Sequence, residues 1–137
     1  MIDIKVEVSG LDIKAFRLEK PIEELVKKTA DFAEKTMKEK APKRTGRLRG
    51  SIRKKVGRLE AEIGPSAPYA IYIEYGTRPH IIRPVRARAL RFEVDGEVVF
   101  TRLIRHPGTK PQRFIRETAE ELQNQISRFA SEVFRLT

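Results

Sequence analysis

Apolar and charged residues alternate at the start of the chain, and the spacing then becomes helical. Residues 2–8 carry an apolar side chain at every second position, which predicts an amphipathic edge strand closed at Gly10. Residues 21–40 carry apolar side chains three and four positions apart, with Pro21 in the first turn and lysines in the last. This pattern predicts a long helix that ends before Pro42.

Strand-like alternation returns in the middle of the chain. A basic loop over residues 41–50 leads to a predicted strand that begins near Ser51. The alternation of residues 58–64 predicts a second strand, joined to the first by a hairpin turn around Gly57. The next segment, 69–76, is apolar or aromatic on both faces of a strand. We predict a third strand here, with one face in the core and the other covered by a helix or another chain.

The last third of the chain contains a hairpin and a second helix. Two strand-like runs flank Asp95-Gly96, a pair suited to a two-residue type I′ turn because glycine adopts positive φ at little cost. A helical stripe predicts a final helix over roughly residues 111–135, capped by Thr109 or Lys110, with Pro111 in its first turn. The element order predicts an α+β fold, with two long helices on one side of a curved antiparallel sheet.

Composition limits the classes of protein that remain. The 137 residues are expected to form a single domain spanning 1–137. The absence of cysteine excludes disulfides and thiolate metal sites, and no apolar run approaches the roughly 18 residues of a membrane span. We therefore expect a soluble intracellular protein, or one assembled inside a cell.

The net charge of +10 is concentrated in one part of the chain. Residues 41–91 hold 13 basic residues and only three glutamates, whereas the remainder is balanced. Such a segment attracts polyanions or an acidic protein face, and the attraction should weaken with salt. A solvated basic surface without a partner is the plain alternative.

Catalysis has little support in the sequence. Glu74, His80 and His106 are the candidates for acid–base chemistry. Arginines near Glu74 would keep it ionised, and the two histidines lie far apart in the sequence. No phosphate-binding loop, nucleophile elbow or metal-ligand spacing is present. We therefore expect no enzyme activity, no cofactor and no metal.

Two binding hypotheses remain open. The basic run 43–55 could neutralise phosphates, and the three tyrosines could stack on bases. On a strand, however, Tyr69 and Tyr75 would share one face, and Tyr72 would lie with Glu74 on the other, which is typical of packing residues. Both long helices are near neutral, so sequence-specific binding is disfavoured. Two hypotheses therefore remain. The protein has a surface that binds polyanions nonspecifically, or it is a subunit that buries surface against copies of itself.

Three stretches resemble the tail-completion, or head–tail neck, family of long-tailed bacteriophages. They are APKRTGRLRGSI at 41–52, YAIYIEYGT at 69–77 and HPGTKPQRFIRETAEEL at 106–122, in the order and spacing typical of that family. The matching positions are Pro42, Thr45, Gly46, Leu48, Ser51, Ile52, Tyr69, Ala70, Tyr72, Glu74, Tyr75, Gly76, Thr77, Pro111 and Phe114. Arg113 departs from the family pattern, which usually has proline there, and the hairpin at Asp95-Gly96 resembles an insertion found in some members.

The resemblance implies a structural virion protein without catalysis, forming a ring of identical subunits at the head–tail junction or tail end. It would be assembled in the host cytoplasm, would contact neighbouring neck or tail proteins, and could touch DNA nonspecifically. A ring needs two different patches on each subunit. We expect one from the basic segment 41–58, with Arg47 and Arg49, and the loop 76–88. The opposing patch would be the acidic face of the last helix, with Glu117, Glu120 and Glu121. The alternative is a small basic protein that binds nucleic acid nonspecifically.

Overall fold

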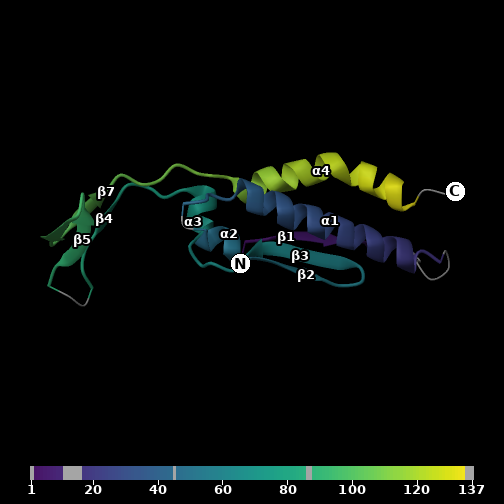
Figure 1. Ribbon diagram of the computed structural model, residues 1–137, viewed down its shortest axis with the longest axis horizontal. Coiled ribbons are helices and arrows are strands. Elements are labelled where there is room, and N and C mark those ends of the chain that lie inside the picture. Colours follow the sequence, from purple (N-terminus) through teal and green to yellow (C-terminus); the bar gives the residue numbers. More distant parts are fainter. Residues whose placement is uncertain (1, 11–16, 45, 86–87, 135–137) are drawn as a thin grey trace.

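The computed structural model of the chain shows a body of helices and sheet from which a β-arm projects (Figure 1). It describes residues 2–10, 17–44, 46–85 and 88–134. The body contains β1 (Ile4–Glu7), α1 (Glu19–Lys40), α2 (Arg47–Ser51), β2 (Ile52–Val56), β3 (Glu60–Pro65), α3 (Ala70–Tyr75) and α4 (Phe114–Val133). The arm contains β4 (His80–Ile82), β5 (Leu90–Val94), β6 (Glu97–Thr101) and β7 (Ile104–His106).

The sheet of the body has three antiparallel strands in the order β1-β3-β2. Ile4 of β1 lies opposite Ile63 of β3, and Ile52 of β2 lies opposite Pro65 of the same strand. The turn between β2 and β3 is closed by the Gly57 N–H, which donates to the carbonyl of Glu60 at 2.7 Å. The predicted edge strand and the predicted hairpin are thus confirmed.

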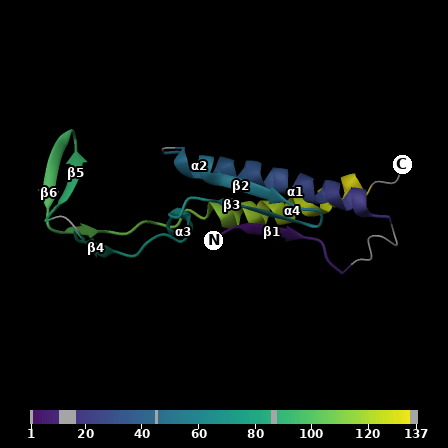
Figure 2. The same ribbon diagram turned by 90° about the horizontal axis from the view of Figure 1, so that it is seen from below.

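Helices α1 and α4 run antiparallel and cover one side of this sheet (Figures 1 and 2). The buried residues of α1 follow the helical spacing of the sequence: Ile22, Val26, Thr29, Ala30, Ala33, Thr36 and Met37. Between the helices, the rings of Phe32 and Phe129 meet edge to face, with centroids 5.3 Å apart. The predicted α+β fold, with its two long helices packed on a sheet, is confirmed.

The predicted loop at 41–50 is partly helical. Gly46, with φ of 74°, precedes the short helix α2, in which Leu48 is buried. Strand β2 then begins at Ile52, close to the predicted start at Ser51. The loop prediction missed this single turn because glycines and basic residues give it little helical periodicity.

The start of α4 was predicted too early. The helix begins at Phe114, so neither Thr109 nor Lys110 caps it, and Pro111 lies outside it. Arg113 occupies the N-cap position and makes no side-chain capping hydrogen bond. Proline suits a first helical turn, but a β-bridge at Thr109 holds the preceding backbone extended.

The arm, residues 77–110, leaves the end of the body where α4 begins (Figures 1 and 2). Two separate ribbons form it: β4 pairs with β7, placing His80 opposite His106, and β5 pairs with β6. Asp95 and Gly96 have φ values of 50° and 83°, which confirms the predicted tight hairpin turn. Among the described residues, neither ribbon pairs with a strand of the body.

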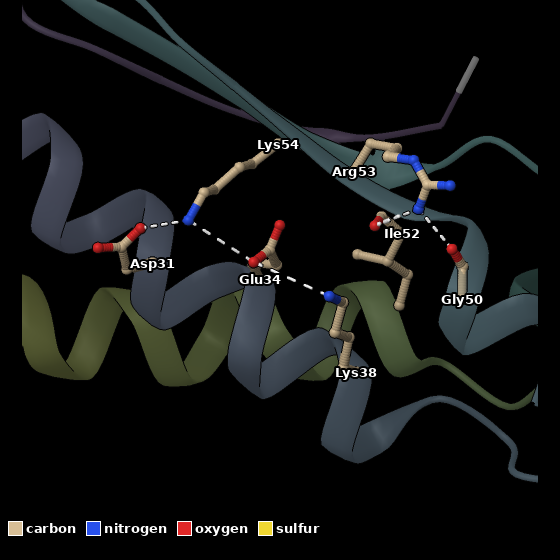
Figure 3. Close-up of polar contacts among 7 residues, drawn as sticks. All are labelled: Asp31, Glu34, Lys38, Gly50, Ile52, Arg53 and Lys54. Atoms are coloured by element: carbon tan, nitrogen blue, oxygen red, sulfur yellow. Dashed lines mark hydrogen bonds and ion pairs between the residues drawn. The ribbon is translucent and has the colours of Figure 1, made fainter.

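A row of charged side chains connects β2 to α1 through ion pairs (Figure 3). Lys54 Nζ lies 2.5 Å from Asp31 Oδ1 and 3.6 Å from Glu34 Oε1. Glu34 Oε1 is in turn 3.9 Å from Lys38 Nζ. The hydrogen bond to Asp31 raises the pKa of Lys54 above its ordinary value of 10.5, because a carboxylate favours the charged ammonium.

We expect Lys54→Met to lower the free energy of unfolding by less than about 1 kcal/mol at neutral pH, since the ion pairs are partly exposed. Because folding raises the lysine pKa, this contribution is complete below pH 10.5 and is lost as pH rises through the higher folded value. Urea unfolding should therefore separate variant and wild type at neutral pH and bring them together in strong alkali. Lys55→Met is the control, because Lys55 makes no ion pair with a described residue. An equal loss in the control would contradict the assignment.

Candidate functional site

The segment 69–77, predicted as a strand, forms a short helix instead. Helix α3 spans Ala70–Tyr75, and the Tyr72 N–H donates to the carbonyl of Tyr69 at 3.0 Å. Gly76, with φ of 73°, ends the helix. The strand prediction is wrong because a short run of apolar and aromatic residues fits a buried strand and a short helix equally well.

The three tyrosines of this segment lie on the surface. Tyr69, Tyr72 and Tyr75 are 39%, 61% and 65% exposed, and Ile71 between them is 46% exposed. The expected packed face shared by Tyr69 and Tyr75 is therefore absent. Beside the helix lies a hollow of about 570 Å³ lined by Ile2, Pro65, Ser66, Ala67, Pro68, Ile71 and Tyr75. An exposed aromatic and apolar surface of this kind is typical of protein contacts.

Glu74 is buried at 3% exposure and binds the start of α4. Its Oε1 accepts a hydrogen bond from the Ile115 N–H at 2.7 Å, and its Oε2 accepts one from the Arg116 N–H at 3.4 Å. The first N–H groups of a helix have no partner within the helix and carry its positive dipole end. Glu74 thus caps α4 from another helix. The sequence predicts arginines beside Glu74, but the groups that hold its carboxylate are backbone amides.

Two Gly-Thr pairs close the base of the arm. Thr77 and Thr109 exchange N–H to carbonyl hydrogen bonds of 3.1 Å in each direction, and their hydroxyl oxygens are 3.1 Å apart. A β-carbon on Gly76 would lie 2.5 Å from the Thr109 carbonyl oxygen, and one on Gly108 would lie 2.4 Å from that of Thr77. Only glycine permits this close approach. The repeated Gly-Thr dipeptide is the sequence signal that could have revealed the pairing.

Residues of the first two motif stretches meet in one groove near the foot of the arm. This motif groove has a volume of about 360 Å³ and is lined by Pro42, Arg44, Arg47, Leu48, Tyr69, Ile73 and Gln112. The Ser51 hydroxyl stabilises its wall by donating to the carbonyl of Leu48 at 2.7 Å. An apolar groove bordered by arginines suits a partner that is apolar with an acidic rim.

The remaining motif residues have separate positions. Gly46 faces open space, since a β-carbon added there would meet no atom within 4 Å. Arg49 is exposed on α2, and Pro111 is exposed ahead of α4. Phe114 is 1% exposed and belongs to the core. Thr45 lies outside the described residues.

The acidic residues of α4 pair within the chain. Glu121 Oε2 lies 3.2 Å and Glu117 Oε2 4.0 Å from Lys40 Nζ, and Glu120 Oε1 lies 3.3 Å from Arg116 Nε. These glutamate side chains are at least half exposed, so the pairs contribute little to stability. Helix α4 itself carries four glutamates against two arginines, and Lys28 and Lys40 of α1 pair with three of these glutamates.

The candidate acid–base residues do not form one site. The rings of His80 and His106 stack with centroids 4.8 Å apart in the arm, whereas Glu74 is bound to α4. Within the described ranges, no group of three or more histidine, aspartate or glutamate side chains could hold a metal ion. Neither α1 nor α4, nor any other helix in the part that the structure describes, has the length and apolar character needed to cross a membrane.

Comparison with known families gives a match over roughly the first half of the chain. Residues 12–76 match the family described as "Bacteriophage HK97-gp10, putative tail-component". The match ends at Gly76, where the arm begins, and confirms the resemblance for the first two motif stretches. The third stretch, 106–122, lies beyond it and stays a prediction. No curated protein matches the chain, and no solved structure matches it.

Proposed function

We propose that this chain completes the tail at the head–tail interface of a phage or prophage as a ring of identical subunits, because residues 12–76 match the HK97-gp10-like family of phage tail components. A tail component of this kind would have its place in the virion. The observation that carries the proposal is that one subunit presents two different charged surfaces. The motif groove has an arginine border, and the glutamates of α4 are exposed.

A closed ring requires two different patches on each subunit. In a head-to-tail interface, one patch of each subunit contacts a different patch of the next, and closure follows when the rotation between them completes a circle. Arg44 and Arg47 border the motif groove, while Glu117 and Glu120 lie exposed on α4. Complementary charges of this kind guide association and fix its register.

We expect the double charge reversal Arg47→Glu with Arg49→Glu to abolish ring formation, because it would place like charges against the acidic face of α4. Electron microscopy and light scattering of the purified protein measure the outcome. The matched control is Lys27→Glu with Lys35→Glu, which changes the net charge equally at exposed positions on α1. Rings that persist in the arginine variant would contradict the assignment of this patch.

Nonspecific nucleic-acid binding is the second candidate function. Five arginines of the arm make no ion pair with a carboxylate in the described part of the chain: Arg78, Arg83, Arg88, Arg102 and Arg105. Phosphate contacts by such residues would give binding that falls steeply with salt. A monomer retained on duplex DNA or heparin until high salt supports this candidate, whereas a discrete multimer with little retention supports assembly.

A further inference from the structure

The arm exposes apolar side chains that its own body does not cover. Val98 and Phe100 of β6 are 44% and 67% exposed, and Ile81, Val85 and Leu103 are also exposed. An isolated two-stranded hairpin is at best marginally stable in water. Contiguous exposed apolar residues mark protein contacts. The arm therefore needs a protein surface as its partner.

One face of the β5–β6 hairpin has a definite character. Val98 and Phe100 are two positions apart on the same strand, so they share a face. The register places Glu93 opposite Val98 and Arg91 opposite Phe100. Arg91 Nη2 lies 3.7 Å from Glu93 Oε1. On this face, β6 therefore presents the apolar side chains of Val98 and Phe100, and β5 presents the Arg91–Glu93 ion pair.

The body offers an apolar groove beside an unpaired strand edge. Strand β1 pairs only with β3 within the described residues, so its outer edge is open. Between β1 and α4 lies a groove of about 370 Å³, lined in part by Ile4, Val6, Leu122 and Ile126. Ile126 is 39% exposed. An open edge accepts an added strand through main-chain hydrogen bonds, and the apolar groove receives its side chains.

Charge distinguishes this edge from the other edge of the sheet. The arm holds eight basic residues and three acidic ones over 77–110. Strand β2, the opposite edge, carries Arg53, Lys54 and Lys55 and would repel it. On the β1 side, Lys5 is paired with Glu7 and Glu60, and the nearby helix α4 carries four glutamates against two arginines. The basic arm is therefore repelled less at the groove between β1 and α4 than at the edge of β2.

We infer that the arm of one copy docks in the β1–α4 groove of a second copy, with β6 along the open edge of β1. Val98 and Phe100 then cover the apolar groove, and the neighbour supplies a fourth strand to the sheet. This inference rests on the proposed ring, because arm and groove are different surfaces and so link copies head to tail.

A pair of introduced cysteines tests the docking directly. The chain contains no cysteine, so any disulfide that forms must join the introduced cysteines. Protein with Val98→Cys is mixed with protein carrying Gln123→Cys, a polar residue lining the groove, and the mixture is oxidised. We expect a disulfide-linked dimer in the mixture and none in either preparation alone. Lys55→Cys on β2 replaces Gln123→Cys as the matched control. Equal cross-linking to Lys55→Cys, or none to Gln123→Cys, overturns the inference.

Three further outcomes separate this inference from the proposed ring. Rings seen by electron microscopy without the Val98–Gln123 cross-link overturn the docking and leave the ring standing. A protein that stays monomeric and gives no cross-link overturns both. Absence of the cross-link together with loss of duplex DNA retention in Arg102→Ala and Arg105→Ala would assign the arm to nucleic acid. Thermal melting of each cysteine variant confirms that the body is folded, since Val98 and Gln123 lie outside the core.

Discussion

Glu74→Ala is expected to lower the free energy of unfolding by about 3 kcal/mol. The substitution leaves the N–H groups of Ile115 and Arg116 without their carboxylate acceptor. The Ile115 N–H is in a buried hydrogen bond, so water does not readily replace the acceptor. The start of α4 also loses the negative charge that balances its dipole. Urea unfolding followed by circular dichroism measures the loss.

Two further variants identify the cause. Glu74→Gln keeps an oxygen acceptor but not the charge, so its loss should fall between that of wild type and Glu74→Ala. Glu24→Ala, at an exposed position of α1, should change stability by less than about 0.5 kcal/mol. If Glu74→Ala were as mild as Glu24→Ala, the capping role of Glu74 would have to be abandoned.

Gly76→Ala is expected to be comparably damaging, at about 3 kcal/mol or more. The glycine has φ of 73° and ψ of 177°, a region that is essentially restricted to glycine and costs other residues about 1–3 kcal/mol. In addition, the new β-carbon would lie 2.5 Å from the carbonyl oxygen of Thr109. That atom belongs to the backbone and cannot move aside like a flexible side chain. The two hydrogen bonds between Thr77 and Thr109 should therefore break.

Gly46→Ala is a control for a glycine at positive φ without a collision. Gly46 has φ of 74° and ψ of −4°, the left-handed helical region, and a β-carbon there would meet no atom within 4 Å. Gly46→Ala should therefore show only the conformational cost of about 1–2 kcal/mol. Urea unfolding compares the two variants, and amide exchange at Thr77 and Thr109 reports opening of the arm base. Equal losses of unfolding free energy in both variants would show that the close approach of the two backbone segments adds nothing to the cost of Gly76→Ala.

Both residues act at the same place in the molecule. Glu74 fixes the start of α4. Gly76 allows the two backbone segments at the base of the arm to approach each other closely. The second motif stretch therefore sets the position of the arm relative to the body. If the arm joins neighbouring copies, its anchoring decides the angle between subunits, and hence whether a ring closes.

The sequence by itself determined the elements whose signals are local. The two long helices, the edge strand β1 and both hairpins follow from periodicity and turn chemistry within a few residues. Asp95-Gly96 is the clearest example, since the two residues alone specify the turn. The first two motif stretches also pointed to the family whose model matches residues 12–76.

Only the tertiary structure decided what Glu74 and Thr77 do. Glu74 acts on a residue 41 positions away, and Thr77 pairs with one 32 positions away. No periodicity within a short window encodes such partners. The choice of helix over strand for α3 is of the same kind, because Ala70 and Glu74, one helical turn apart, are both buried when the segment is helical. Local pattern left both structures open, and the energy of the long-range contacts selected one.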